Sequence, residues 1–231
     1  MMNRPTRILA ASALSCALSP AFAADSVTMK VGGTLVAPSC NIALSDATVD
    51  FGDIARGSLG NTSATALPAS KAKTLNASVA CVGNTAIAIS TVDNSEASKP
   101  TDIRSFDFGN GPVTLPTAQY AGLGRASNNA AIGAYAVRVG TVTVGTVAGG
   151  SSDAVKMLSG VDTTSLTEVS GTVYLDATKP VISAADATGN SMSGNSFNFP
   201  LTVAGNISAT DNLPAEEIDL NGSTTIEVKY L

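Results

Sequence analysis

The chain has 231 residues, of which 13% are charged, and it contains no His and no Trp. Acidic residues outnumber basic ones by 18 to 13, which argues against nucleic acid as a partner because its recognition needs a basic surface. The lack of His also excludes Ser-His and Cys-His catalytic pairs. Sparse charge together with 44% hydrophobic residues indicates a packed protein and not a disordered one.

Residues 1–23 have the pattern of a secretory signal peptide. Arg4 and Arg7 precede an apolar run over residues 8–18, and Ala21-Phe22-Ala23 is typical of a cleavage site. We therefore expect export and cleavage after Ala23, which leaves 11 basic and 18 acidic residues and a formal charge of −7. The apolar run is shorter than the roughly 18 residues that a membrane helix needs.

Alternation of side chains marks residues 26–35 as a strand, because successive side chains of a strand point to opposite faces. Thr28, Lys30 and Thr34 share the polar face. The opposite face carries Val27, Met29, Val31, Gly33 and Leu35. This strand stands at the start of the mature protein, and we predict that it pairs with another subunit.

Three cysteines indicate one disulfide. Cys16 lies in the signal peptide, in surroundings that fit a lipidation site poorly. Cys40 and Cys81 form an even pair in an exported protein, for which a disulfide is expected, and a loop of this length contributes roughly 4 kcal/mol in the chain-entropy model. A metal site at the two cysteines would lack His ligands.

The segments after Cys40 predict a series of short strands separated by turns rich in Gly, Ser, Asn and Asp. In residues 75–82, Leu75, Ala77, Val79 and Cys81 share one face, so the disulfide should point inward. The other predicted strands cover residues 40–44, 48–52, 86–92, 168–176, 197–207 and 220–231, with one or two hairpins in 132–147. Residues 154–158 fit either a strand or a helical turn.

Two stretches are predicted to lack regular structure. Residues 95–116 are loop-like except for an alternating pair, Phe106 and Phe108, and residues 183–196 are polar and flexible in composition. No segment has a helical period over three turns. The expected fold is an all-β, immunoglobulin-like β-sandwich.

Paired carboxylates were considered as catalytic groups, since glycosidases work with carboxylates alone. Asp50 with Asp53, and Glu216 with Glu217, lie in turn-like segments without aromatic sugar platforms, and we expect solvated loop residues. Residues 186–190 suggest a calcium loop but lack the glutamate expected at its end. We therefore expect neither an enzyme nor a bound cofactor.

Features at the two ends of the chain occur together in one known family. Gly33 stands seven residues before Cys40, Cys81 follows 41 residues later, and residues 220–230 alternate up to Tyr230, next to last. With residues 48–54, which look like a short strand of that family, these features resemble subunits of chaperone-usher pili, of the type 1 kind. The resemblance implies a sandwich over residues 37–231 that lacks its last strand, and an N-terminal donor strand over residues 24–36.

The resemblance also implies the partners and the location. A periplasmic chaperone would fill the open groove first, and at an outer-membrane usher the extension of a neighbouring subunit would replace it, with Gly33 fixing the register. The groove-edge strand would carry Ile226, Val228 and Tyr230, and basic residues of the chaperone would hold the carboxylate of Leu231. The implied protein is a structural subunit of a surface pilus of a Gram-negative bacterium, which contributes to cell adhesion.

The middle of the chain departs from an ordinary pilin because it is longer. Residues 121–124 and 132–135 resemble a less characterised fimbrial-like family, and the role of residues 95–160 stays open, as does any receptor. A two-domain tip adhesin is a poorer fit because such a subunit has no use for a donor strand. The alternatives are a secreted, self-complemented β-sandwich resembling spore-coat proteins, and a carbohydrate-binding module or carboxylate hydrolase.

Overall fold

A computed structural model describes residues 27–35, 38–102, 104–145 and 153–231, and the chain divides into two units, residues 1–36 and 37–231. The predicted signal peptide and Cys16 lie outside the described residues. In the first unit residues 27–35 form no strand, so the predicted strand is not made by the chain alone. Val27, Met29, Val31 and Leu35 are 82–100% exposed.

The second unit is all-β, as the sequence predicts, and its described helices are single 3-10 turns. The first strands are β1 (Cys40–Leu44), β2 (Thr65–Ala66), β3 (Lys73–Asp93), β4 (Arg104–Asp107), β5 (Pro112–Leu115), β6 (Ala121–Gly122) and β7 (Gly133–Val139). They are followed by β8 (Val142–Gly145), β9 (Asp153–Gly160), β10 (Thr167–Val169), β11 (Val173–Tyr174), β12 (Val181–Ala185), β13 (Ser193–Ile207) and β14 (Thr224–Tyr230). The 3-10 turns are η1 (Arg56–Ser58), η2 (Ala69–Lys71), η3 (Glu96–Ser98), η4 (Thr117–Gln119) and η5 (Thr210–Asn212).

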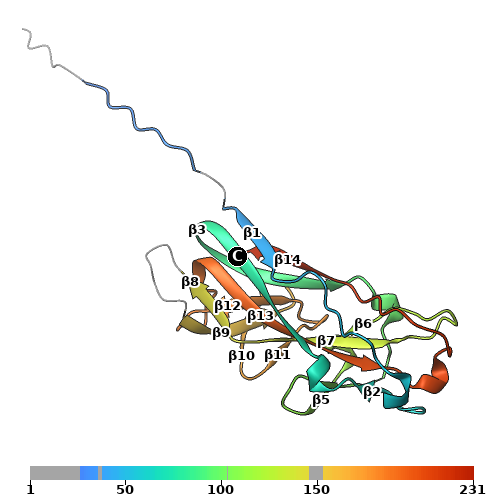
Figure 1. The fold of residues 1–231 in the computed structure, drawn as a ribbon. Coiled ribbons are helices and arrows are strands. Elements are labelled where there is room, and N and C mark those ends of the chain that lie inside the picture. The colour runs from blue at the N-terminus through green and yellow to red at the C-terminus, as the bar shows by residue number, and fades with distance from the viewer. Residues whose placement is uncertain (1–26, 36–37, 103, 146–152) are drawn as a thin grey trace, which may run out of the picture. The chain divides into compact units, whose positions relative to one another are not determined.

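Two long strands organise this unit (Figure 1). The first part of β3 pairs with β1 and β13, whereas its last residues pair with β12 and β14. We predicted separate strands over residues 75–82 and 86–92, and the structure instead has one continuous strand of 21 residues. Gly83, at φ +82°, lies between the two parts, in a conformation that other residues rarely adopt. One strand therefore serves two layers.

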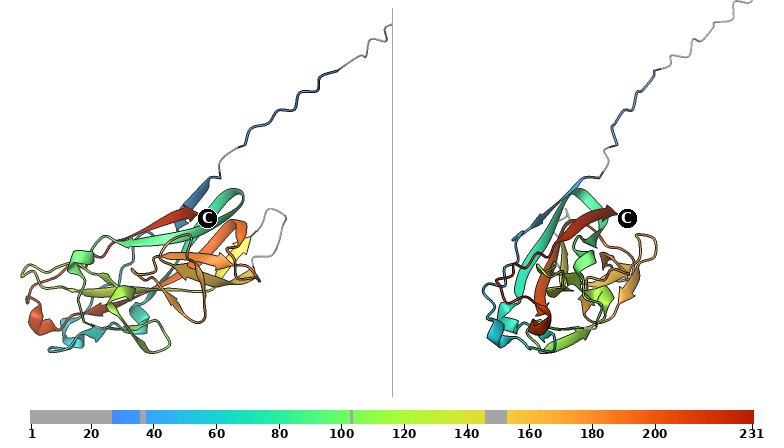
Figure 2. Two further views of the ribbon diagram at one scale, coloured as in Figure 1. Left: turned by 180° about the vertical axis from the view of Figure 1, so that it is seen from behind. Right: turned by 90° about the vertical axis from the view of Figure 1, so that its right-hand side faces the viewer.

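The strands form two antiparallel layers, consistent with a β-sandwich (Figures 1 and 2). One layer has the order β1, β3, β13, β7 and β11, and the other has β14, β3, β12, β9 and β10. The core between them includes Val79, Ile87, Ile89, Ile182, Phe197, Phe199 and Leu201, which are all nearly inaccessible to solvent. The predicted inward face of the first part of β3 is confirmed, because Leu75, Ala77 and Val79 are buried and their neighbours are exposed.

The prediction of a flexible segment over residues 183–196 is wrong at both ends, and only residues 186–192 lie outside a named strand. Residues 181–185 form the fully buried strand β12, and residues 193–196 begin β13. The polar Ser183 is accommodated because its hydroxyl donates to the carbonyl oxygen of Ile87 at 2.7 Å. A buried hydroxyl with a partner costs little, and composition alone did not reveal that partner.

The long middle segment forms a second apolar cluster. Strands β4 and β5 form a hairpin, and its Phe106 and Phe108 are buried, although the segment was predicted to be loop-like. Tyr120 packs on Phe106 with ring centroids 5.6 Å apart. The cluster is completed by Leu115, Ala134, Ala136 and Ala204. The alanines of β7 leave room for the rings, so the hairpin covers one face of that strand.

Candidate functional site

A groove of about 1160 Å³ runs along the other face of the sandwich core. One wall is the segment after β1, residues 44–56, and the other is residues 213–226, which lead into β14 (Figure 1). The floor is made of core side chains, most of which are only 1–8% exposed. They include Leu75, Leu123, Tyr135, Val137, Leu175, Leu201 and Val203. The groove is therefore apolar at its base and open to solvent above.

The first wall has no strand, so the predicted strand over residues 48–52 is wrong. Its side chains still alternate, with Phe51 buried and Val49 half-buried against the core. The backbone bends at Gly52, at φ +63°, whose N–H donates to the carboxylate of Asp50 at 2.7 Å. Residues 48–52 therefore alternate as in a strand, although no other described strand pairs with them.

The second wall ends in β14, which pairs with residues 87–93 of β3 along one edge. Ile226 and Val228 are half-buried against the core, as the alternation predicts. Glu227 and Lys229 lie on the opposite face and form an ion pair at 2.6 Å. Among the described residues, no strand pairs with the second edge of β14. That edge presents unpaired backbone groups beside the groove.

Hydrogen bonds tie the two walls together at both ends. The backbone N–H of Cys40 donates to the hydroxyl of Tyr230 at 2.9 Å. Far from there, the guanidinium of Arg56 donates to the carbonyl oxygens of Thr210, Leu213 and Pro214 at 2.6–2.8 Å. The walls therefore run antiparallel, and the groove lies between them.

The disulfide predicted from the sequence is confirmed. Cys40 and Cys81 are bonded, and they face each other in the register of β1 and β3. Both are half-buried and pack against the core. The bond fixes the start of the first wall to the layer that forms the groove floor, and it is typical of an oxidising compartment outside the cytoplasm. Among the described residues, no helix is long and apolar enough to cross a membrane.

Tyr135 projects from β7 between the groove and a second, smaller cavity. Its hydroxyl lies 2.5 Å from the hydroxyl of Thr224, at the start of β14. Burial raises the pKa of Tyr135 to about 12. Both cavities are lined by Tyr135, Val137, Leu175 and Thr224. The two hydroxyls thus join β7 to the groove wall and separate the cavities.

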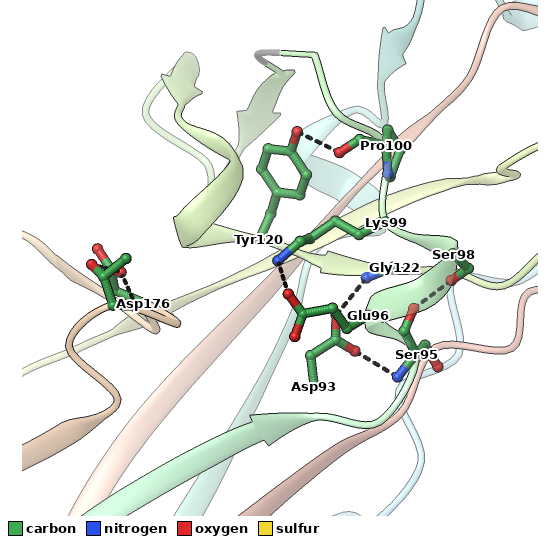
Figure 3. Close-up of polar contacts among 10 residues, drawn as sticks. Asp93, Ser95, Glu96, Ser98, Lys99, Pro100, Tyr120, Gly122 and Asp176 are labelled. Atoms are coloured by element: carbon green, nitrogen blue, oxygen red, sulfur yellow. Dashed lines mark hydrogen bonds and ion pairs between the residues drawn. The ribbon is translucent and has the colours of Figure 1, made fainter. Parts of the chain in front are cut away.

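The second cavity has a volume of about 280 Å³, and polar groups in its lining form hydrogen bonds and an ion pair (Figure 3). Asp93 accepts hydrogen bonds from the N–H groups of Ser95 and Gly122, at 2.8 and 3.1 Å. Lys99 pairs with Glu96 at 3.2 Å, as the figure shows. The glycine motif at residues 121–124 is explained here, since a Cβ on Gly122 would lie 2.4 Å from the hydroxyl oxygen of Ser98.

The four carboxylates considered in the sequence lie on the groove and not in a closed cleft. Asp50 and Asp53 are exposed on one wall, and Glu216 and Glu217 are exposed on the other. The calcium-like loop is a self-contained turn, because Asp186 accepts bonds from Thr188 and Asn190. These bonds lower the pKa of Asp186, the hydroxyl of Thr188 most. No group of three metal-ligating side chains occurs within the described residues.

Comparison with known proteins gives one match. Residues 29–136 are similar to a family described as a protein of unknown function (DUF1120), over less than half of the chain. The matched span contains most of residues 27–35, both bonded cysteines and the strands from β1 into β7. No curated protein and no solved structure matches the chain.

The sequence indicated the disulfide and the groove-edge strand β14, but not the residues at the centre of the groove. The disulfide was predicted from an even pair of cysteines, and β14 from its alternating side chains, whereas the predicted role of residues 27–35 stays a prediction. Arg56 was missed because three carbonyl acceptors that lie more than 150 positions away leave no local signal. The alternation of Tyr135 and Val137 predicted a strand, but nothing in the sequence indicated that these side chains border a groove.

Proposed function

We propose that the protein is a non-enzymatic structural subunit of a surface fibre, in which the groove binds an extended strand from a neighbouring subunit. The observation that carries this proposal is the groove itself, with its apolar floor beside the unpaired edge of β14. Strand addition of this kind takes affinity from backbone hydrogen bonds and specificity from alternate side-chain positions. The same chain carries an alternating segment that it does not itself fold into a strand.

Burial of that segment supplies a sufficient driving force. Val27, Met29, Val31 and Leu35 are exposed, and burying each contributes roughly 1.5–3 kcal/mol. The total is about 6–12 kcal/mol before the entropy of association is subtracted and backbone bonds are added. An exposed apolar stripe and an open apolar groove therefore complement each other.

The alternation also defines the register of the strand. A slip by one residue would place Thr28, Lys30 and Thr34 on the apolar floor, which is strongly unfavourable. Gly33 would occupy the shallowest position along the groove, where a larger side chain would not fit. We propose Gly33 as the register mark of the donor strand, whose apolar residues are Val27, Met29, Val31 and Leu35.

Assembly of the fibre would follow from the unpaired edge. A periplasmic chaperone would cover the groove with one of its strands, and exchange at an outer-membrane usher would bring in the extension of the next subunit. Leu231 follows β14 and is 41% exposed, so its carboxylate is accessible to basic residues of a chaperone. This sequence of events leads through the periplasm to the cell surface.

Deletion of residues 24–36 tests the proposal. The truncated protein, expressed with and without a cognate chaperone, should accumulate only with it, and should then exchange the chaperone for the peptide SVTMKVGGTLV. Co-purification and a gel-shift on peptide addition measure both steps. A truncated protein that is stable, monomeric and indifferent to the peptide would contradict the proposal. A full-length monomer whose extension is protected at every concentration would favour the self-complemented alternative.

A further inference from the structure

The rim of the groove carries six acidic residues, three on each wall. Asp46, Asp50 and Asp53 lie on the first wall. Glu216, Glu217 and Asp219 lie on the second. All six are exposed, and none forms a salt bridge with another described residue. Two rows of carboxylates thus face each other across an apolar floor and make the opening of the groove electronegative.

Two basic side chains near this rim donate hydrogen bonds to backbone carbonyl oxygens. Arg56 donates to two carbonyl oxygens of the second wall and to that of Thr210, which precedes it. Lys71 donates to the carbonyl oxygen of Asp53 at 2.8 Å. Among the six acids, Asp46, Asp50 and Glu216 accept hydrogen bonds from Thr48, Gly52 and Ser127. Neutral donors leave the negative charge of a carboxylate in place, and carbonyl acceptors likewise leave the positive charges of Arg56 and Lys71, so six acids and two bases give the rim a net charge of −4.

The alternating part of the extension has the opposite charge, although Asp25 precedes it. Residues 27–35 contain one basic residue, Lys30, and no acidic residue. Lys30 is exposed and lies on the face opposite Val27, Met29 and Val31. When those residues face the floor, Lys30 faces the opening, and strands of a sheet are only about 4.8 Å apart. Its flexible side chain can then reach carboxylates on either wall.

We propose that the acidic rim selects the incoming strand by charge, and that its occupant is the extension of a second copy of this chain, through Lys30. The inference rests on the proposed function and adds to it the partner and a selection rule. Electrostatic complementarity of this kind raises the association rate and disfavours strands of the wrong charge more than it adds affinity. The selection is therefore strongest at low salt, where charges interact over longer distances.

Binding of labelled peptides to the full mature chain, measured by fluorescence anisotropy, tests this proposal. SVTMKVGGTLV should bind about three- to tenfold more tightly than the same peptide with Lys30→Glu at low ionic strength, and within about twofold at 0.5 M salt. The variant Asp53→Asn with Glu217→Gln should lose this discrimination. These two acids are chosen because their side chains accept no hydrogen bond from another described residue.

A control variant removes two charges away from the groove. Asp107→Asn with Glu168→Gln makes the net charge less negative by the same two units, and neither residue lines the groove, so discrimination should persist. In sedimentation velocity, Lys30→Glu in the full chain should reduce self-association, and adding Asp53→Lys with Glu217→Lys should restore it. Equal binding of both peptides at low salt overturns the charge rule and leaves the proposed function standing. Binding of neither peptide overturns both.

Discussion

The two faces of β7 have different surroundings: a hairpin of the same chain covers one face, and the other lines the groove. Ala134 and Ala136 face the aromatic cluster of the β4–β5 hairpin and are fully buried. Tyr135 and Val137, on the opposite face, line the groove. The β4–β5 hairpin covers the first face, and the second borders the groove between residues 44–56 and 213–226. We propose this groove as the place of a partner strand.

The largest effect is expected on the closed face. Phe106→Ala removes a fully buried ring and should destabilise the second unit by about 3–5 kcal/mol, because a cavity replaces packed side chains. Urea unfolding followed by circular dichroism measures this loss. Affinity for the peptide SVTMKVGGTLV should be unchanged in the folded variant, since Phe106 does not line the groove. A large loss of affinity without unfolding would show that the two faces are not independent.

The second-largest loss of stability is expected on removal of the disulfide, which connects the first groove wall to the core. Replacing both Cys40 and Cys81 by Ser should cost about 2–4 kcal/mol, because the 41-residue separation is no longer constrained in the unfolded chain. Thermal unfolding of the double variant and of the reduced wild type should agree. A double variant as stable as the oxidised protein would contradict a structural role for the bond.

Tyr135, on the face of β7 that lines the groove, should make the stability of the protein depend on pH in the alkaline range. Its folded pKa of about 12 lies above the ordinary value of 10.0, so the stabilising effect is complete below pH 10 and is lost as pH rises through 12. The wild type should lose about 2–3 kcal/mol over this interval that Tyr135→Phe does not lose. Urea unfolding at pH 9 to 12 measures the difference. Parallel curves for the two proteins would show that the hydroxyl is not buried beside Thr224.

The smallest effect is expected on the outer face of β14. Lys229→Ala removes an exposed ion pair with Glu227 and should change stability by less than about 1 kcal/mol. Its peptide affinity should equal that of the wild type, because the side chain faces away from the groove. Val228→Ala is the matched variant on the inner face, and it should weaken peptide binding. Equal peptide affinities of the two variants would contradict the assignment of the faces.

The sequence predicted those parts of the fold that depend on neighbours two positions apart. The inward face of Leu75, Ala77 and Val79 and the alternation in β14 follow from such local patterns, whereas the disulfide followed from the cysteine count and the expected export. Residues 48–52 have the same pattern but no strand, because pairing depends on whether another segment lies alongside. Buried polar residues were also missed. Arg104 has Asp102 and Asn206 as partners, and the second of these is 102 positions away.

Backbone hydrogen exchange in the groove walls, with and without bound peptide, tests the central claim most directly. With SVTMKVGGTLV bound, amides of residues 224–230 and 46–54 should become protected, whereas those of the β4–β5 hairpin should not change. The peptide with Val31→Asp should give no protection, because it would bury a carboxylate on the apolar floor. Binding of the unchanged peptide without protection of either wall would contradict the account.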